Sequence, residues 1–297
     1  MKAVIFPLRI CLQVRWGFVL LSYRHSYHAG NFADVLKHIV LVEIFDYLTK
    51  KDKSFDYMDT HAGAGLFNLK SNHAAKLEEH TQGIDRLHRK DWPELSKYFE
   101  VIDAYNNFPS TTFYPGSPLI AKYFLRPQDK AWFYELHPKD FQLLGANVAH
   151  DRRIKIYDQD GFSGLLALLP PISRRGFIFI DPSYEVKVDY ERVYEIVSKA
   201  YKKFSTGIYV VWYPVVSREK IDRLEKKFIK SGIKNIQRFE VGIDQDSDAR
   251  GMTSSGMFVI NAPWGLFVKM GMLLPKLSKS LGAVNSALFR CDVLTTE

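Results

Sequence analysis

The chain has 297 residues, with 46% hydrophobic, 25% charged and 14% aromatic side chains, a composition that excludes a disordered, collagen-like or disulfide-stapled protein. The 41 lysines and arginines exceed the 33 aspartates and glutamates, which gives a formal net charge of +8. This excess attracts polyanions such as nucleic acid or acidic membranes, and it can also serve solubility alone. The two cysteines, Cys11 and Cys291, provide neither a disulfide framework nor a cysteine metal site, which indicates a reducing compartment.

The N-terminal stretch resembles a signal peptide only superficially. Pro7, Arg9 and Arg15 interrupt its apolar run, and no small-residue cleavage site follows. No other stretch approaches the ~20 apolar residues that a membrane span needs. We therefore expect a cytoplasmic protein in which residues 1–20 are an extension outside the fold and residues 21–297 form one domain.

Segments of helical period alternate with short β-branched and aromatic runs from Asn31 onward, which predicts an α/β domain with a mostly parallel sheet and helices on both faces. Residues of about 68–113 are charged and helical in pattern, which predicts a small helical insertion. In chain order, we predict a helix over 33–49 capped at Asn31, a strand over 55–59, a short helix after 118, a strand over 131–135, a helix from 137, a strand over 154–157, a helix after 161, a strand over 177–181, a helix over 190–204, a strand over 208–212, a helix over 218–230, and a hairpin of 236–241 with 256–261 at the sheet edge.

A glycine-rich turn, residues 59–65 (DTHAGAG), follows the first predicted strand at the edge where open α/β sheets bind ligands. Gly63 and Gly65 let the backbone approach a ligand closely, although such glycines can also form only a tight turn. A dinucleotide fingerprint needs a third glycine where Asn68 stands, so a nicotinamide site is disfavoured.

Two further strand ends carry groups that suit an adenosine. Glu135 closes a strand, where a carboxylate can accept both ribose hydroxyls, unless it is only a solvated acid at a helix start. Asp160 and Gly161 follow the next strand and can place a carboxylate and a bare backbone beside an adenine ring.

The tetrad Asp181-Pro182-Ser183-Tyr184 follows the most apolar strand, and each residue type in it suits a substrate that carries a nucleobase amino group. Asp181 can accept a hydrogen bond from the amino group and help to remove a proton. The carbonyl of Pro182 can accept the second hydrogen, and the ring of Tyr184 can stack on an extruded base. The alternative is a strand followed by a plain proline turn.

Together these motifs resemble the class I S-adenosylmethionine-dependent amino-methyltransferases that act on adenine N6. Within that class, the chain is most similar to the bacterial 23S ribosomal RNA adenine-N6 methyltransferases. The resemblance runs from about Leu21 into the C-terminal region, and its ordered motifs are 21–31 (LSYRHSYHAGN), 33–38 (ADVLKH), 59–65 (DTHAGAG), 114–119 (YPGSPL), 135–138 (ELHP) and 250–253 (RGMT).

The resemblance implies a Rossmann-like domain that transfers a methyl group from S-adenosylmethionine to N6 of adenine 2030 in 23S ribosomal RNA. It implies Asp181, with Pro182 and Tyr184 beside it, as the catalytic residues. At the matching positions, the cofactor would be held by Lys37, His38, His61, Ser117, Glu135, Asp160, Gly161 and Asp181, to which the glycine turn adds Gly63.

Contacts to the RNA are expected from a segment of alternating aromatic and basic residues ahead of the first helix. Tyr23 is the contact that the resemblance implies, and Arg24 beside it is a phosphate partner. Lys37 and the pair Arg174–Arg175 are expected as further phosphate partners. The expected partner is thus 23S ribosomal RNA, with neither a metal nor a membrane, and we expect the protein to act as a monomer.

The chain departs from the family pattern at Ser183, where the usual tetrad has a second proline. This difference bears on the rate of methyl transfer more than on the type of reaction. Two other functions are also compatible with these motifs. A DNA adenine methyltransferase would use the same tetrad, although the chain lacks a sizeable separate target-recognition domain. An RNA-binding relative with weakened catalysis is the other, because Ser183 loosens the turn.

Overall fold

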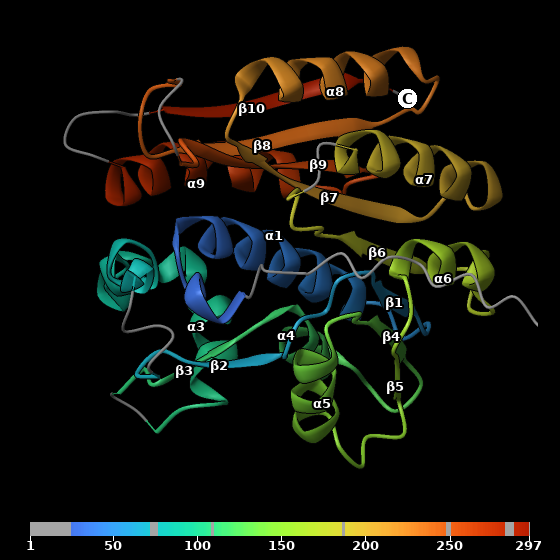
Figure 1. The fold of residues 1–297 in the computed structure, drawn as a ribbon, viewed down its shortest axis with the longest axis horizontal. Coiled ribbons are helices and arrows are strands. Elements are labelled where there is room, and N and C mark those ends of the chain that lie inside the picture. Colours follow the sequence, from blue (N-terminus) through green and yellow to red (C-terminus); the bar gives the residue numbers. More distant parts are fainter. Residues whose placement is uncertain are drawn as a thin grey trace, which may run out of the picture.

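The computed structural model describes residues 25–71, 77–107, 110–185, 188–247, 251–282 and 288–296. The predicted extension over 1–20 and the predicted RNA contacts Tyr23 and Arg24 lie outside these ranges. The main feature is an eight-stranded mixed sheet (Figure 1). Its spatial order is β10 (Leu288–Thr295), β8 (Ile236–Gly242), β9 (Ser254–Ile260), β7 (Ile208–Val215), β6 (Gly176–Ile180), β1 (Asp56–Asp59), β4 (Lys130–Tyr134) and β5 (Ile154–Tyr157).

The strands from β5 to β7 run parallel, and their register is level. Asp56 at the start of β1 is opposite Lys130 of β4 on one side and Gly176 of β6 on the other. Parallel strands that start level also end level, so the residues that follow β1, β4 and β6 meet at one edge of the sheet. This is the edge at which the sequence analysis placed its candidate residues.

The other half of the sheet is antiparallel. The predicted hairpin is confirmed, because β8 pairs with β9, but its placement at the edge is wrong. β9 lies inside, between β7 and β8, and the outermost strand is β10, for which the sequence analysis gave no element. Cross-strand ion pairs join this last strand to β8, through Arg238 with Asp292 and Glu240 with Arg290.

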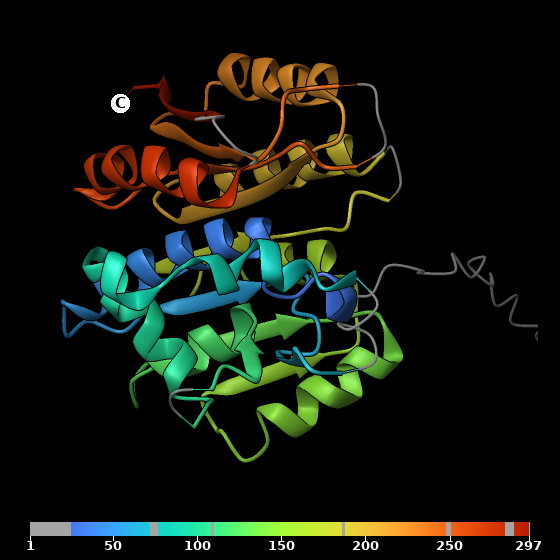
Figure 2. The same cartoon turned by 90° about the vertical axis from the view of Figure 1, so that its left-hand side faces the viewer.

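Helices cover both faces of the sheet, as predicted. Figure 2 shows α9 on one side and α7 with α8 on the other. The helix α1 lies beside α4 and α9. In the described ranges no helix is long and apolar enough to cross a membrane. The helix bounds are α1 (Phe32–Thr49), α3 (Ser96–Asp103), α4 (Ser117–Phe124), α5 (Pro138–Asn147), α6 (Gly161–Leu168), α7 (Asp189–Lys203), α8 (Arg218–Lys230) and α9 (Leu266–Leu281).

The helix α1 begins where the sequence predicts it. The side chain of Asn31 accepts a hydrogen bond from the backbone N–H of Asp34 at 3.0 Å, which satisfies one of the unpaired donors at the helix start. Almost every residue of the helix is buried, because the sheet lies on one side and α3, α4 and α9 lie around the rest. A charged residue in its first turns therefore needs a charged partner inside the protein.

The segment over 68–113 is less helical than expected. Its described part contains α3 and four 3₁₀ turns, η2 (Glu79–Gln82), η3 (Ile84–Arg86), η4 (Arg89–Asp91) and η5 (Pro93–Leu95). A small second sheet of β2 (Leu66–Asn68) and β3 (Phe113–Pro115) closes its base. Another 3₁₀ turn, η1 (His25–Tyr27), precedes α1. Gly83 and Pro93 interrupt the pattern that would have supported a longer helix.

This segment packs tightly on the turn that precedes α1. A Cβ at Gly83 would lie 2.0 Å from the carbonyl oxygen of Gly30, so only glycine fits there. The carboxylate of Glu79 hydrogen-bonds to His28 at 3.0 Å and accepts from the Asn31 amide at 2.9 Å. The segment over 68–113 is thereby held to the entry of α1.

The aromatic centre of the core provides a stability test. Phe45 is fully buried, and its ring centroid lies within 6.1 Å of the rings of Phe55, Tyr57, Phe124 and Phe177. We expect Phe45→Ala to lower the free energy of unfolding by about 3–5 kcal/mol in urea titrations, because it opens a cavity among rings. Phe289→Ala, on the partly exposed strand β10, is the matched control with a clearly smaller loss. Equal losses would contradict this account of the core.

Candidate active site

The glycine turn after β1 has the backbone shape for which the sequence suggested it. Gly63 and Gly65 have positive φ angles of 61° and 81°. A Cβ at Gly65 would also lie 2.6 Å from Leu119, whereas at Gly63 the angle alone favours glycine. The turn carries backbone N–H groups toward the end of β4, where Glu135 stands.

The carboxylate of Glu135 is fixed by two backbone donors. Its Oε2 accepts from the N–H of Gly63 at 2.8 Å and its Oε1 from the N–H of His137 at 2.6 Å. Burial raises the pKa of Glu135, and the two donors oppose that shift. Each oxygen keeps a further lone pair, so the oriented carboxylate can accept two vicinal hydroxyls.

The end of β5 provides the next wall of the site. Asp160 caps α6 by accepting from the N–H of Phe162, and a Cβ at Gly161 would lie 2.1 Å from the carbonyl oxygen of Thr60. The ring of His61 meets the ring of Phe162 edge-on at 5.0 Å. Burial lowers the pKa of His61 to about 4, so its imidazole is neutral at physiological pH.

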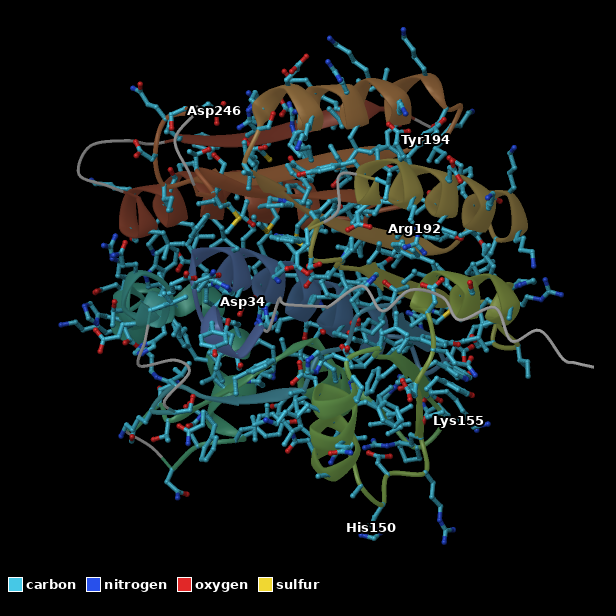
Figure 3. The ribbon with its side chains drawn as sticks, in the orientation of Figure 1. Asp34, His150, Lys155, Arg192, Tyr194 and Asp246 are labelled. Carbon is cyan, nitrogen blue, oxygen red and sulfur yellow. The ribbon has the colours of Figure 1, made fainter. Side chains whose placement is uncertain are left out.

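Arg192 of α7 reaches the same wall, and the sequence analysis did not single it out. Its guanidinium lies 4.9 Å from the centre of the Phe162 ring and 3.3 Å from the carboxylate of Asp160. Figure 3 shows Arg192 on the helix side that faces these elements. His61, Gly63, Glu135, Asp160 and Gly161 are thus brought to one edge of the sheet, in a setting that fits an adenosine.

Behind the glycine turn lies a buried polar cluster. Asp59 accepts a hydrogen bond from the hydroxyl of Tyr57 at 3.0 Å and is hydrogen-bonded to Ser117. Burial raises the pKa of Asp59 to about 7, although both hydroxyls oppose this. Ser117 therefore contacts the end of β1, and its role at the cofactor stays a prediction.

His38 occupies a second buried cluster. Its Nδ1 lies 2.9 Å from the hydroxyl of Tyr114, which in turn lies 2.9 Å from the hydroxyl of Tyr98. Burial lowers the pKa of His38 to about 3, although the nearby carboxylate of Asp34 acts in the opposite direction. The role of His38 at the cofactor stays a prediction.

The tetrad aspartate is joined to a lysine of α1. Nζ of Lys37 donates to Oδ2 of Asp181 at 2.8 Å and lies 3.1 Å from Oδ1 of Asp34. The same ammonium lies 4.6 Å from the centre of the Trp212 ring, a cation–π contact. Burial raises the pKa of Asp181, and the charge of Lys37 opposes this shift. The sequence named Lys37 and Asp181 separately, and the fold brings them into direct contact.

Tyr184 is anchored within the protein. Its hydroxyl donates to the carbonyl oxygen of Trp212 at 2.6 Å, and its ring centroid lies 4.6 Å from that of Tyr190. The backbone of Tyr184 has a positive φ of 54°, which is unfavourable for a non-glycine residue and is held by these contacts. One side of the ring is thus covered by Tyr190, and stacking of a base on Tyr184 stays a prediction.

The predictions of Lys37 and of the pair Arg174–Arg175 as phosphate partners are corrected. Lys37 is buried with its two carboxylates, so it does not face solvent where RNA phosphates would lie. Arg175 precedes β6, at the opposite end of the strand from Asp181, and donates to the carbonyls of Leu48 and Lys53 at 2.7 Å each. The pair Arg174–Arg175 therefore lies at the wrong edge of the sheet to assist the site.

Asp34 and Trp212 were not among the predicted site residues. A signal existed for Asp34, because the first eleven residues of α1 (FADVLKHIVLV) are apolar apart from Asp34, Lys37 and His38. Charges in such an apolar helix must be paired internally. No comparable signal marked Trp212, which lies within an apolar strand.

The fold defines the class of protein. The mixed sheet with helices on both faces and an antiparallel end is the Rossmann-like α/β fold that the sequence predicted for a class I methyltransferase. The family model described as "Ribosomal RNA large subunit methyltransferase D, RlmJ" matches residues 52–290. The chain belongs to this family.

Individual relatives agree with this assignment. The chain is 48% identical over 264 residues to "Ribosomal RNA large subunit methyltransferase J" of Escherichia coli, covering 88% of this chain and 94% of that one. It is 44% identical over 281 residues to the protein of the same name from Haemophilus influenzae, covering 94% and 100%. A crystal structure of a Legionella pneumophila protein superimposes with a TM-score of 0.82 at 35% identity, covering 90% of this chain and 98% of that one.

The burial of His38 predicts an acid sensitivity of the fold. Its pKa of about 3 lies below the value of about 6.5 that an unfolded histidine has. The stability that the neutral ring contributes is therefore complete above pH 6.5 and is lost as the pH falls toward 3. From pH 7.5 to pH 5, this histidine should account for about 2 kcal/mol of lost unfolding free energy. Urea titrations of His38→Gln should show a correspondingly shallower pH dependence, and an unchanged one would contradict the assignment.

Proposed function

We propose that the protein transfers a methyl group from S-adenosylmethionine to N6 of adenine 2030 in 23S ribosomal RNA. The observation that carries the proposal is the tetrad at the end of β6, where the Asp181 carboxylate is held by Lys37 at 2.8 Å. The names of the two relatives support ribosomal RNA as the substrate. The amino group as the methylated atom is inferred from the chemistry of the tetrad.

The ends of β1, β4 and β5 fit the cofactor. The carboxylate of Glu135, oriented by the N–H groups of Gly63 and His137, suits the two ribose hydroxyls. Asp160, Gly161 and the neutral ring of His61 suit an adenine. When bound, S-adenosylmethionine supplies a methyl group that the adjacent sulfonium already activates.

The protein then has to position an amino group. We assign Oδ1 of Asp181 and the carbonyl oxygen of Pro182 as the acceptors of its two hydrogens, since Oδ2 already accepts a hydrogen bond from Lys37. Acceptors on both hydrogens orient the nitrogen lone pair toward the methyl group and can take up the proton that is lost. The charge of Lys37 opposes the rise in the pKa of Asp181 that burial causes, and so favours the ionised carboxylate that this role uses.

The same tetrad would serve a DNA adenine methyltransferase, so the polymer has to be tested directly. Tritiated cofactor should label 23S ribosomal RNA that lacks the modification. It should not label the same RNA with guanine at position 2030, nor duplex DNA. Labelling of DNA in preference to RNA would support the first alternative, and binding of RNA without labelling would support the weakened relative.

Asp181→Asn is expected to abolish methylation while it changes the dissociation constant of the cofactor by no more than a few-fold. The amide cannot accept through both of its terminal atoms, so it loses the acceptor role that the substrate needs. Single-turnover rates and calorimetric titration of the cofactor measure the two effects separately. A variant with nearly normal turnover would exclude Asp181 as the catalytic residue.

Glu135→Gln is expected to do the converse. Loss of charge-assisted bonds to two hydroxyls should weaken cofactor binding by about 2–3 kcal/mol, or roughly 30- to 150-fold. Glu195→Gln on the exposed surface of α7 is the control, with an unchanged dissociation constant in the same calorimetric titration. If both variants bind equally well, Glu135 does not hold the ribose.

A further inference from the structure

Asp34 is a buried carboxylate that has no part in the function proposed so far. It lies in the first turn of α1, inside the fold, and Figure 3 shows it among the central elements. Its Oδ1 lies 3.1 Å from Nζ of Lys37, and its Oδ2 lies 2.8 Å from Nε2 of His25. The same Oδ2 accepts from the backbone N–H of Gly30 at 2.9 Å.

The three charged groups form a row that ends at the tetrad. The side chains of Asp34, Lys37 and Asp181 are 0%, 4% and 16% exposed, and the ammonium lies between the two carboxylates. Although burial by itself raises the pKa of Asp34, His25 and Lys37 hold it well below the usual range. His25 and Lys37 thus both favour the ionised form of the Asp34 carboxylate.

The position of Asp34 bears on which oxygen of Asp181 the lysine contacts. An ammonium group has three N–H donors, so a lysine with a single carboxylate partner is able to contact both of its oxygens. With Asp34 on its other side and the face of Trp212 beneath it, Lys37 donates a hydrogen bond to Oδ2 of Asp181. Within the described part of the chain, Oδ1 of Asp181 receives no hydrogen bond, so it can accept one from a substrate.

We propose that Asp34 is a positioning residue of the methyl-transfer site, which holds Lys37 on one oxygen of Asp181 and so leaves the other oxygen for the adenine amino group. This inference rests on the proposed function, because it assigns Asp181 the role described above. Asp34 also binds His25 and the N–H of Gly30, so the chain that leads into α1 is anchored on the same carboxylate.

A double-mutant cycle of Asp34→Asn and Lys37→Met tests the proposal. Single-turnover rates at saturating cofactor and RNA should fall at least tenfold in Asp34→Asn, while the dissociation constant of the cofactor stays within threefold. Because Asp34 acts through Lys37, adding Asp34→Asn to Lys37→Met should cause no further loss of rate. The double variant should also have a higher melting temperature than Lys37→Met, because in Lys37→Met the buried Asp34 has lost its lysine partner.

Asp129→Asn is the matched structural control. Asp129 is also fully buried, but it accepts from Arg126 and from the N–H of Phe55 at the opposite edge of the sheet. This variant should lower the melting temperature and leave the rate unchanged. An Asp34→Asn variant with the same behaviour, or rate losses that add in the cycle, would overturn the proposal.

Two further arms complete the design. If Asp34→Asn is too unstable to assay, Asp34→Glu takes its place, since it keeps the charge and moves it by one methylene. Asp34→Glu should then lower the rate at least tenfold on its own but cause no further loss when it is added to Lys37→Met. A wild-type rate in Asp34→Glu would overturn the proposal. A wild-type protein that fails to methylate RNA would overturn both the proposed function and this inference, whereas an active wild type with an additive cycle would overturn only the inference.

Discussion

The site depends on the level register of three parallel strands. Asp56, Lys130 and Gly176 are aligned at the start of β1, β4 and β6, so the chain leaves all three strands at the same height. Groups from distant parts of the sequence therefore converge without any long loop to place them. A shift of β4 by one residue would turn its alternate side chains to the other face and separate Glu135 from the glycine turn.

Burial of charge is the second organising feature. The helix α1 brings Asp34 and Lys37 under the sheet edge, where neither could remain ionised alone. Each is stabilised by the other and by His25 or Asp181, and the face of Trp212 supports the ammonium. Removing one member leaves an uncompensated buried charge, so the row behaves as a unit rather than as separate pairs.

Local signals in the sequence predicted most of the fold. The cap at Asn31 and the apolar strand before Asp181 are read from a few neighbouring residues, and both are confirmed. For the strand β10 a pattern was present in the sequence but was not used. Phe289, Cys291 and Val293 alternate with Arg290 and Asp292, as apolar and charged residues do in a strand. The structure of the segment over 68–113 was harder to predict, because charged residues with helical spacing are equally compatible with short 3₁₀ turns.

The site was predicted as a set of residues but not as a network. Lys37 and Asp181 are 144 positions apart, and no local pattern reveals that such residues touch. The error at Arg174–Arg175 has another cause, because the pair precedes the predicted strand and Asp181 follows it, so chain order already places them at opposite ends of that strand. What the sequence cannot supply is the relative placement of elements, and that placement decides whether a lysine meets a phosphate or a carboxylate.

Trp212 connects the antiparallel half of the sheet to the residues of the candidate active site. Its ring lies against Lys37, its carbonyl oxygen accepts from Tyr184, and its Nε1 donates to the hydroxyl of Ser255 on β9 at 2.8 Å. Divergence at position 212 would therefore disturb three neighbours at once. Over evolutionary time, positions 212 and 255 should change together or not at all, although one of them lies on a strand that contributes no group to the reaction.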